Sequence, residues 1–160
     1  MVTLRSLRGG FSLLELLVVT AMISMICAMG LLRLGNCLAT AELSAAALEL
    51  AADLRWMQQA SVNSPVGAGG PFYSITFNQA SGGGYVVKAG LNVHKRVVFP
   101  ESVRLANLPQ AISFTMVGSP TCAQSIALKS LRTNEVRYVI VAAVTGRVRL
   151  SDSAAWEGGE

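Results

Sequence analysis

Residues that could do chemistry are few in this chain of 160 residues, which contains one histidine and three cysteines. His94 stands alone in a Val-His-Lys-Arg stretch, where a solvated loop or strand end is the simplest interpretation. The chain has no CxxC, HExxH, GxSxG or phosphate-loop pattern. Widely spaced cysteines and one histidine do not form a four-ligand zinc site. We therefore expect no catalytic residue, no metal, no cofactor and no enzymatic activity.

The cysteines have structural interpretations. Cys27 falls in a long apolar stretch and is expected to behave there as a small apolar side chain. Cys37 and Cys122 lie outside that stretch, and a disulfide between them stays open as an alternative if the compartment is oxidising. The sequence does not decide between the bridged and the free state.

A pair of arginines near the end of the chain has a spacing suited to anions. Arg147 and Arg149 are two residues apart on a predicted strand, so both should project from one face, about 7 Å apart. Val148 and Leu150 should then face the core. Two guanidinium groups held side by side suit phosphate oxygens. The alternative is a solvated face of an edge strand, where charges discourage unwanted pairing.

The N-terminal region combines a basic start with a long apolar run. Residues 1–10 contain Arg5 and Arg8 and no acidic residue. Residues 11–32 contain a single charged residue, Glu15. Such a run spans roughly 33 Å as a helix, enough for the ~30 Å core of a bilayer. The basic flank predicts a cytoplasmic N-terminus. A secretory signal cut after Gly30 and a plain uncleaved anchor are alternatives, but neither explains an acid whose burial costs about 2.5–3.5 kcal/mol.

Gly9-Gly10-Phe11-Ser12-Leu13-Leu14-Glu15 resembles the class III signal of type IV pilins and pseudopilins. The resemblance implies that a prepilin peptidase cuts between Gly10 and Phe11 and that Phe11 is N-methylated. It also implies an assembly role for Glu15, whose charge would offset the new amine in its own chain or in a neighbouring subunit. Leu32 stands where major pilins often carry proline, which favours a minor pilin or pseudopilin.

The middle of the chain predicts a continuing helix and then strands. Residues 36–63 carry one apolar stripe at helical spacing: Leu43, Ala47, Leu50, Leu54 and Met57. A helix over residues 11–63 would be about 80 Å long. Beyond the Pro- and Gly-rich residues 64–71 the period becomes two, and short connections predict hairpins. The expected strands are 72–77, 85–89, 97–99, 103–105, 111–116, 125–131, 135–141 and 146–150.

These patterns predict an α+β fold, with a long N-terminal helix packed on a mostly antiparallel β-sheet. The expected organisation is a leader peptide (1–10), a transmembrane half of the helix (11–32), an amphipathic half (33–63), a β-rich globular domain (64–150) and a flexible tail (151–160).

Two further segments resemble the GspH/FimT family of pilin-like proteins. Residues 50–60 look like that family's late-helix pattern, interrupted by Trp56 and Met57, and residues 145–150 look like its terminal Gly-Arg-Val strand. In FimT-like minor pilins a Gly-Arg-x-Arg motif is associated with binding DNA, and Gly146-Arg147-Val148-Arg149 matches it.

The resemblance implies a minor pilin-like subunit that serves type II secretion or a type IV pilus. Its role would be structural, priming or capping the fibre and contacting cargo or partner pilins. The alternative is a DNA-binding minor pilin for DNA uptake. The expected location is the inner membrane, crossed once, with the globular domain outside it and in the periplasm of a Gram-negative cell.

Overall fold

The computed structural model describes residues 12–63, 72–79 and 83–153. One helix, α1 (Leu13–Asn63), is followed by eight strands among these residues. The chain divides into two units, Met1–Asn36 and Cys37–Glu160, so α1 contributes its first part to one unit and its second part to the other. The helix Leu13–Asn63 agrees closely with the predicted helix over residues 11–63: Ser12 is not helical, and Phe11 lies outside the described residues.

In the first unit, α1 is apolar on every side. Its large side chains are exposed all around the helix, among them Leu13, Met22, Met25 and Ile26. By length and composition, α1 is the one helix in the described part of the chain that could cross a membrane. Two polar side chains in this segment bond to the helix itself: Thr20 Oγ1 donates to the Leu17 carbonyl, and Ser24 Oγ donates to the Thr20 carbonyl. These bonds lower the cost of placing hydroxyls in an apolar setting.

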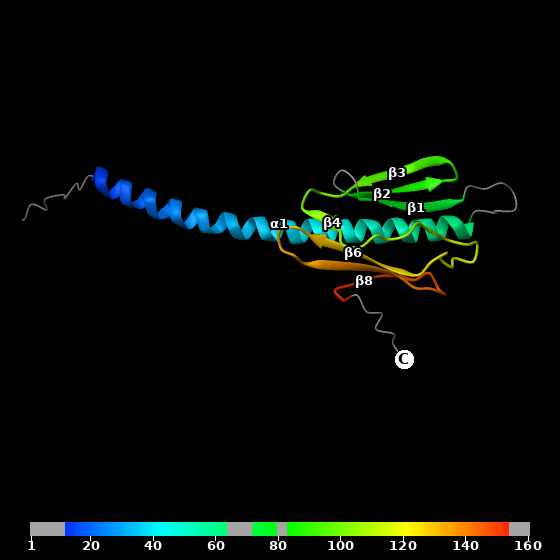
Figure 1. Ribbon diagram of the computed structural model, residues 1–160. Helices are drawn as coiled ribbons and strands as arrows, with labels where there is room; N and C mark the ends of the chain where they lie inside the picture. The colour runs from blue at the N-terminus through cyan, green and yellow to red at the C-terminus, as the bar shows by residue number, and fades with distance from the viewer. Residues whose placement is uncertain (1–11, 64–71, 80–82, 154–160) are drawn as a thin grey trace, which may run out of the picture. The chain divides into compact units, whose positions relative to one another are not determined.

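In the second unit, two four-stranded sheets pack against the C-terminal part of α1 (Figure 1). The first sheet has the order β3-β2-β1-β5, from β1 (Tyr73–Asn78), β2 (Gly84–Ala89), β3 (Asn92–Val98) and β5 (Ile112–Ser113). The second has the order β4-β6-β7-β8, from β4 (Val103–Leu105), β6 (Gln124–Ser130), β7 (Val136–Val141) and β8 (Val148–Ser151). Every strand pair is antiparallel.

The core lies between the helix and the inner faces of the two sheets. All five residues of the predicted helical stripe are buried, and Leu43, Leu50, Leu54 and Met57 are completely so. They pack with inward-facing residues of both sheets, including Ile75, Tyr85, Ile126 and Val139. In β6 and β7 the core residues occupy alternate positions, although Ala127 and Ile140 between them are also buried. The predicted α+β fold is therefore confirmed.

The structure differs from the sequence prediction in strands whose apolar and polar residues do not alternate clearly. Predicted strand 97–99 is the end of β3, which begins at Asn92, because an edge strand exposed on both faces carries no apolar period. Predicted strand 111–116 shortens to β5, since Phe114 makes only an isolated bridge to Pro120 and the chain turns at Gly118. Residues 146–150 also shift, because Gly146 and Arg147 belong to the turn before β8.

Candidate functional site

The structure describes only some of the predicted N-terminal site residues. Gly10 and Phe11, the expected cleavage and methylation residues, lie outside the described residues. Glu15 lies in the first turn of α1, and its side chain is exposed. The carboxylate is therefore accessible to a group outside its own helix.

The second part of α1 has an exposed seam opposite its buried stripe. We define the seam as Leu38, Ala41, Ala45, Leu48 and Ala52, which follow one another at spacings of three and four. All five side chains are exposed, although none is polar. Alternating spacings of three and four place side chains on one narrow face of a helix, as in the contact surface of a coiled coil. The helix is thus apolar on the face that its own domain covers and on this uncovered face.

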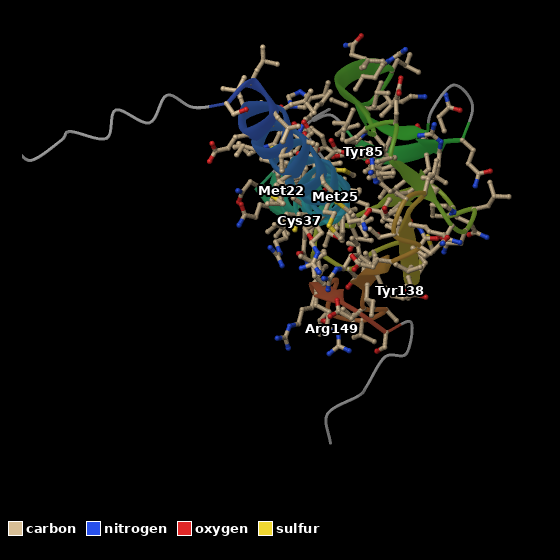
Figure 2. The ribbon with its side chains drawn as sticks, turned by 90° about the vertical axis from the view of Figure 1, so that its left-hand side faces the viewer. Met22, Met25, Cys37, Tyr85, Tyr138 and Arg149 are labelled. Carbon is tan, nitrogen blue, oxygen red and sulfur yellow. The ribbon has the colours of Figure 1, made fainter. Side chains whose placement is uncertain are left out.

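A groove runs between α1 and β8. Its lining residues are Leu48, Arg55, Gln58, Gln59, Arg147, Val148, Arg149 and Leu150, and its volume is about 580 Å³. The structure therefore brings Arg147 and Arg149 together with Arg55, which the sequence analysis did not single out. Figure 2 shows Arg149 on β8 near the margin of the domain. Leu150 was expected in the core but is 38% exposed, because β8 is the edge strand of its sheet.

Arg55 bonds to the backbone on the unpaired side of this edge strand. Its guanidinium donates a hydrogen bond of 3.0 Å to the carbonyl oxygen of Val148. An unpaired carbonyl on an edge strand is a template for pairing with another chain. The bond occupies that acceptor and holds β8 beside the helix, while the remaining donors of the guanidinium are available for an anion.

Gly146 has a structural reason to be glycine. Its φ is +64°, and a Cβ at this position would stand 2.3 Å from the Gly118 carbonyl oxygen and 2.6 Å from Gln58 Nε2. The Gln58 amide donates to the carbonyl oxygens of Gly118, at 2.8 Å, and Thr145, at 3.1 Å. Gly146 therefore allows two turns and the helix to meet at one end of the groove.

On the other side of the helix, β3 carries a polar and aromatic cluster. Lys95 Nζ lies 3.0 Å from Glu49 and 2.8 Å from Asp53, and Tyr85 donates a hydrogen bond of 2.7 Å to Asp53. Burial, the bond to Asp53 and the nearby carboxylates raise the pKa of Tyr85 far above its usual value. The hydrogen bond to Asp53 also raises the pKa of Lys95.

His94 takes part in an aromatic stack. Its ring stacks on Trp56 with centroids 4.6 Å apart, and Trp56 meets Tyr73 edge to face at 5.3 Å. His94 is exposed in β3, where its ring packs on Trp56 at the surface. Across the described residues, no group of three His, Cys, Asp or Glu side chains is placed to hold a metal ion.

The three cysteines are free. Cys27 and Cys37 are exposed, and Cys122 is half-buried with its thiol 3.5 Å from the Ala111 carbonyl oxygen. The structure thus contains no disulfide between Cys37 and Cys122, the pairing that the sequence left open.

Comparisons with known proteins bear on the fold of the chain. No protein-family model matches the chain, and no curated protein matches it. A solved structure that resembles it is that of the type IV minor pilin FimU of Pseudomonas aeruginosa (strain PAO1), with a TM-score of 0.50 and 18% sequence identity. The similarity covers 68% of this chain and 91% of that chain. The chain accordingly has a pilin-like fold, with one apolar N-terminal helix packed on antiparallel sheets.

Proposed function

We propose that this chain is a minor pilin-like subunit, or pseudopilin, of a type II secretion or type IV pilus assembly. It would be anchored once in the inner membrane by the first part of α1, with a cytoplasmic N-terminus and the second unit outside the membrane. The role is structural rather than enzymatic: the subunit primes or caps a fibre of pilins or pseudopilins and contacts cargo or partners.

The observation that carries this proposal is the apolar surface of α1 that the chain leaves uncovered. The first unit offers a helix that suits a bilayer, and the exposed seam extends apolar character into the part of α1 that already packs on its own domain. A helix of a soluble monomer normally exposes a polar face. A second apolar face whose residues have coiled-coil spacing is best buried by packing against a helix of another subunit.

Processing at the N-terminus follows from the same proposal. A prepilin peptidase would cut between Gly10 and Phe11, which leaves α1 attached to the product, and the new Phe11 amine would then be methylated. The exposed carboxylate of Glu15 would pair with the amine of a neighbouring subunit during assembly.

The test is site-specific photocrosslinking in membranes that contain the assembly. Benzoylphenylalanine at Ala45, in the seam, should crosslink to a partner pilin. The matched control is the same probe at Leu91, an exposed residue in the β2–β3 turn. Equal crosslinking from both positions, or none from Ala45, would contradict assembly through the seam.

A second candidate function is DNA binding for DNA uptake, and the groove favours it. Three arginines line the groove, Arg55 from the helix and Arg147 and Arg149 from the end of the chain, with two glutamine amides beside them. Guanidinium groups suit phosphate oxygens, and amides add donors to a nucleic-acid backbone. In this proposal Gly146 shapes the turn that carries Arg147.

A further inference from the structure

The exposed seam of α1 continues into the groove beside β8. Leu48 belongs to both surfaces, because it is a seam residue and also lines the groove. Beyond Ala52, the same alternation of three and four residues leads to Arg55 and then to Gln59, which are both exposed. These two side chains therefore occupy the next core positions of the heptad pattern that the seam follows. The face of the helix is thus apolar as far as Ala52 and polar at the following two positions.

A polar side chain within a heptad pattern selects a partner. In a coiled coil, a polar residue at a core position lowers the stability but fixes the register and the choice of partner. Arg55 carries a charge, and an apolar residue opposite it would leave that charge buried without a counter-charge. Its hydrogen bond of 3.0 Å to the Val148 carbonyl oxygen holds the guanidinium at this place. The group that best matches Arg55 is therefore a carboxylate.

Strand β8 adds positive charge beside this position. Arg147, which is exposed, and Arg149, which is half-buried, line the groove together with Arg55. None of the eight described residues that line the groove is acidic. Glu49 and Asp53, the acids on this stretch of the helix, form ion pairs with β3 instead. A partner that covers this end of the seam must therefore bring its own carboxylates.

A second copy of the chain fits this surface poorly. Two helices anchored in the same way in one membrane run parallel, and in register each core residue lies opposite its own copy. Arg55 would then face Arg55, and the like charges would repel each other. A different subunit that has an acidic residue at this level has no such conflict.

We propose that the seam binds a parallel helix of a different pilin-like subunit. That helix is apolar at heptad spacing opposite the seam, from Leu38 to Ala52, and acidic opposite Arg55. Its carboxylates pair with Arg55 and with Arg147 from β8, and they thereby set the register of the two helices. The inference rests on the proposed structural role, because it names the chemistry of the partner in the assembly.

The experiment measures how tightly fluorescent helical peptides bind to the full chain in lipid nanodiscs. The probe is a stapled three-heptad peptide with leucine or alanine at its core positions, except for glutamate at the last one and at its neighbour. One matched peptide has glutamine in place of both glutamates, and another carries the glutamates in its first heptad. Fluorescence anisotropy should show that the probe binds about fivefold more tightly than either matched peptide.

Variants of the chain identify the groups that recognise the acids. Arg55→Glu should reverse the preference, so that a peptide with lysine in place of the two glutamates binds more tightly than the probe. Such a reversal cannot result from unfolding. Arg147→Gln should reduce the advantage of the probe over the glutamine peptide. Lys88→Gln, which removes a positive charge from β2, is the matched control and should leave that advantage unchanged.

The outcomes separate this inference from the proposed function. Equal affinity for the probe and the glutamine peptide overturns the inference, but it leaves assembly through the seam in place if Ala45 crosslinks to a partner pilin. No crosslinking from Ala45 contradicts the proposed function itself. Crosslinks from Ala45 to a second copy of the chain, or a groove that binds duplex DNA and none of the peptides, would also overturn the inference.

Discussion

Gly146 and Gly118 approach so closely that a Cβ on Gly146 would lie 2.3 Å from the carbonyl oxygen of Gly118. Gly146 belongs to the turn before β8, and Gly118 belongs to the turn between β5 and β6. Gln58 from the helix donates a hydrogen bond to the Gly118 carbonyl oxygen. The relationship fixes the end of β8 against the helix, and so it places the arginines that line the groove.

Gly146→Ala should therefore destabilise the second unit by about 3 kcal/mol, since it combines a positive φ with overpacking. Gly90→Ala is a matched control, because Gly90 has nearly the same φ, +63°, with nothing within 4 Å of the added Cβ. The control should cost only about 1 kcal/mol. Urea unfolding followed by near-ultraviolet circular dichroism measures both, and equal losses would show that the close approach is unimportant.

Alkaline pH should weaken the fold through Tyr85 and Lys95. The pKa of Tyr85 is raised in the folded chain, so an unfolded tyrosine ionises above pH 10.0 while the folded one stays protonated. Unfolding then releases a proton, and stability is lost as the pH rises above that value. The raised pKa of Lys95 acts in the same direction above pH 10.5.

Tyr85→Phe should flatten this alkaline loss and cost about 1–3 kcal/mol at neutral pH, because Asp53 loses a hydrogen-bond donor. Thermal unfolding at a series of pH values measures both effects. Tyr138→Phe, which removes a hydroxyl from β7, is the control. A variant whose alkaline profile equals that of the unaltered chain would show that Tyr85 does not carry the linkage.

Processing should remove residues 1–10. The intact mass of the membrane-extracted protein should correspond to a chain that starts at Phe11 and carries one added methyl group. Gly10→Val should leave the precursor uncut, because a branched side chain crowds a site read as glycine. A mature chain that starts at Leu31 would instead establish a secretory signal and would remove the basis for the pilin proposal.

Glu15→Leu should favour the membrane and disfavour assembly. The substitution removes a burial cost of about 2.5–3.5 kcal/mol, so partitioning into the membrane should improve. Crosslinking from Ala45 to partner pilins should nevertheless fall, because the Phe11 amine of the neighbouring subunit loses its counter-charge. Glu101→Leu removes an acid from the second unit and should leave crosslinking unchanged. Undiminished crosslinking in the Glu15 variant would show that this charge is incidental.

Arg147→Gln/Arg149→Gln tests the DNA-binding proposal. If each arginine meets one phosphate, the slope of log affinity against log salt should decrease by roughly 2, as titrations of duplex DNA at several salt concentrations would measure. Lys88→Gln/Lys129→Gln removes the same charge elsewhere. An equal decrease of the slope in the control variant would indicate that DNA binding depends on the overall charge rather than on these two arginines. If the unaltered chain does not bind DNA even at low salt, the DNA-uptake function is excluded and the structural role stands.

Local periodicity was sufficient to predict the main elements. Apolar residues spaced three and four apart lie on one face of a helix, wherever that helix lies in the fold. The buried stripe that includes Leu43 and Leu54 could therefore be predicted from the sequence alone. The same holds for strands whose core residues recur at every second position, such as β6 and β7. Edge strands such as β3 carry a weaker pattern because neither face is fully covered, and their bounds were predicted less well.

The groove and the seam depended on tertiary structure. Arg55 and Val148 are 93 residues apart in the chain, and they meet because two sheets pack on one helix and leave β8 at an edge. The seam residues resemble the buried stripe in composition, and only the position of the sheets decides which stripe is covered. The sequence by itself therefore determined the helix, most strands and the N-terminal motif, since these depend on neighbouring residues. Packing between distant segments decided which side chains form a surface, because burial depends on what covers a residue as well as on its type.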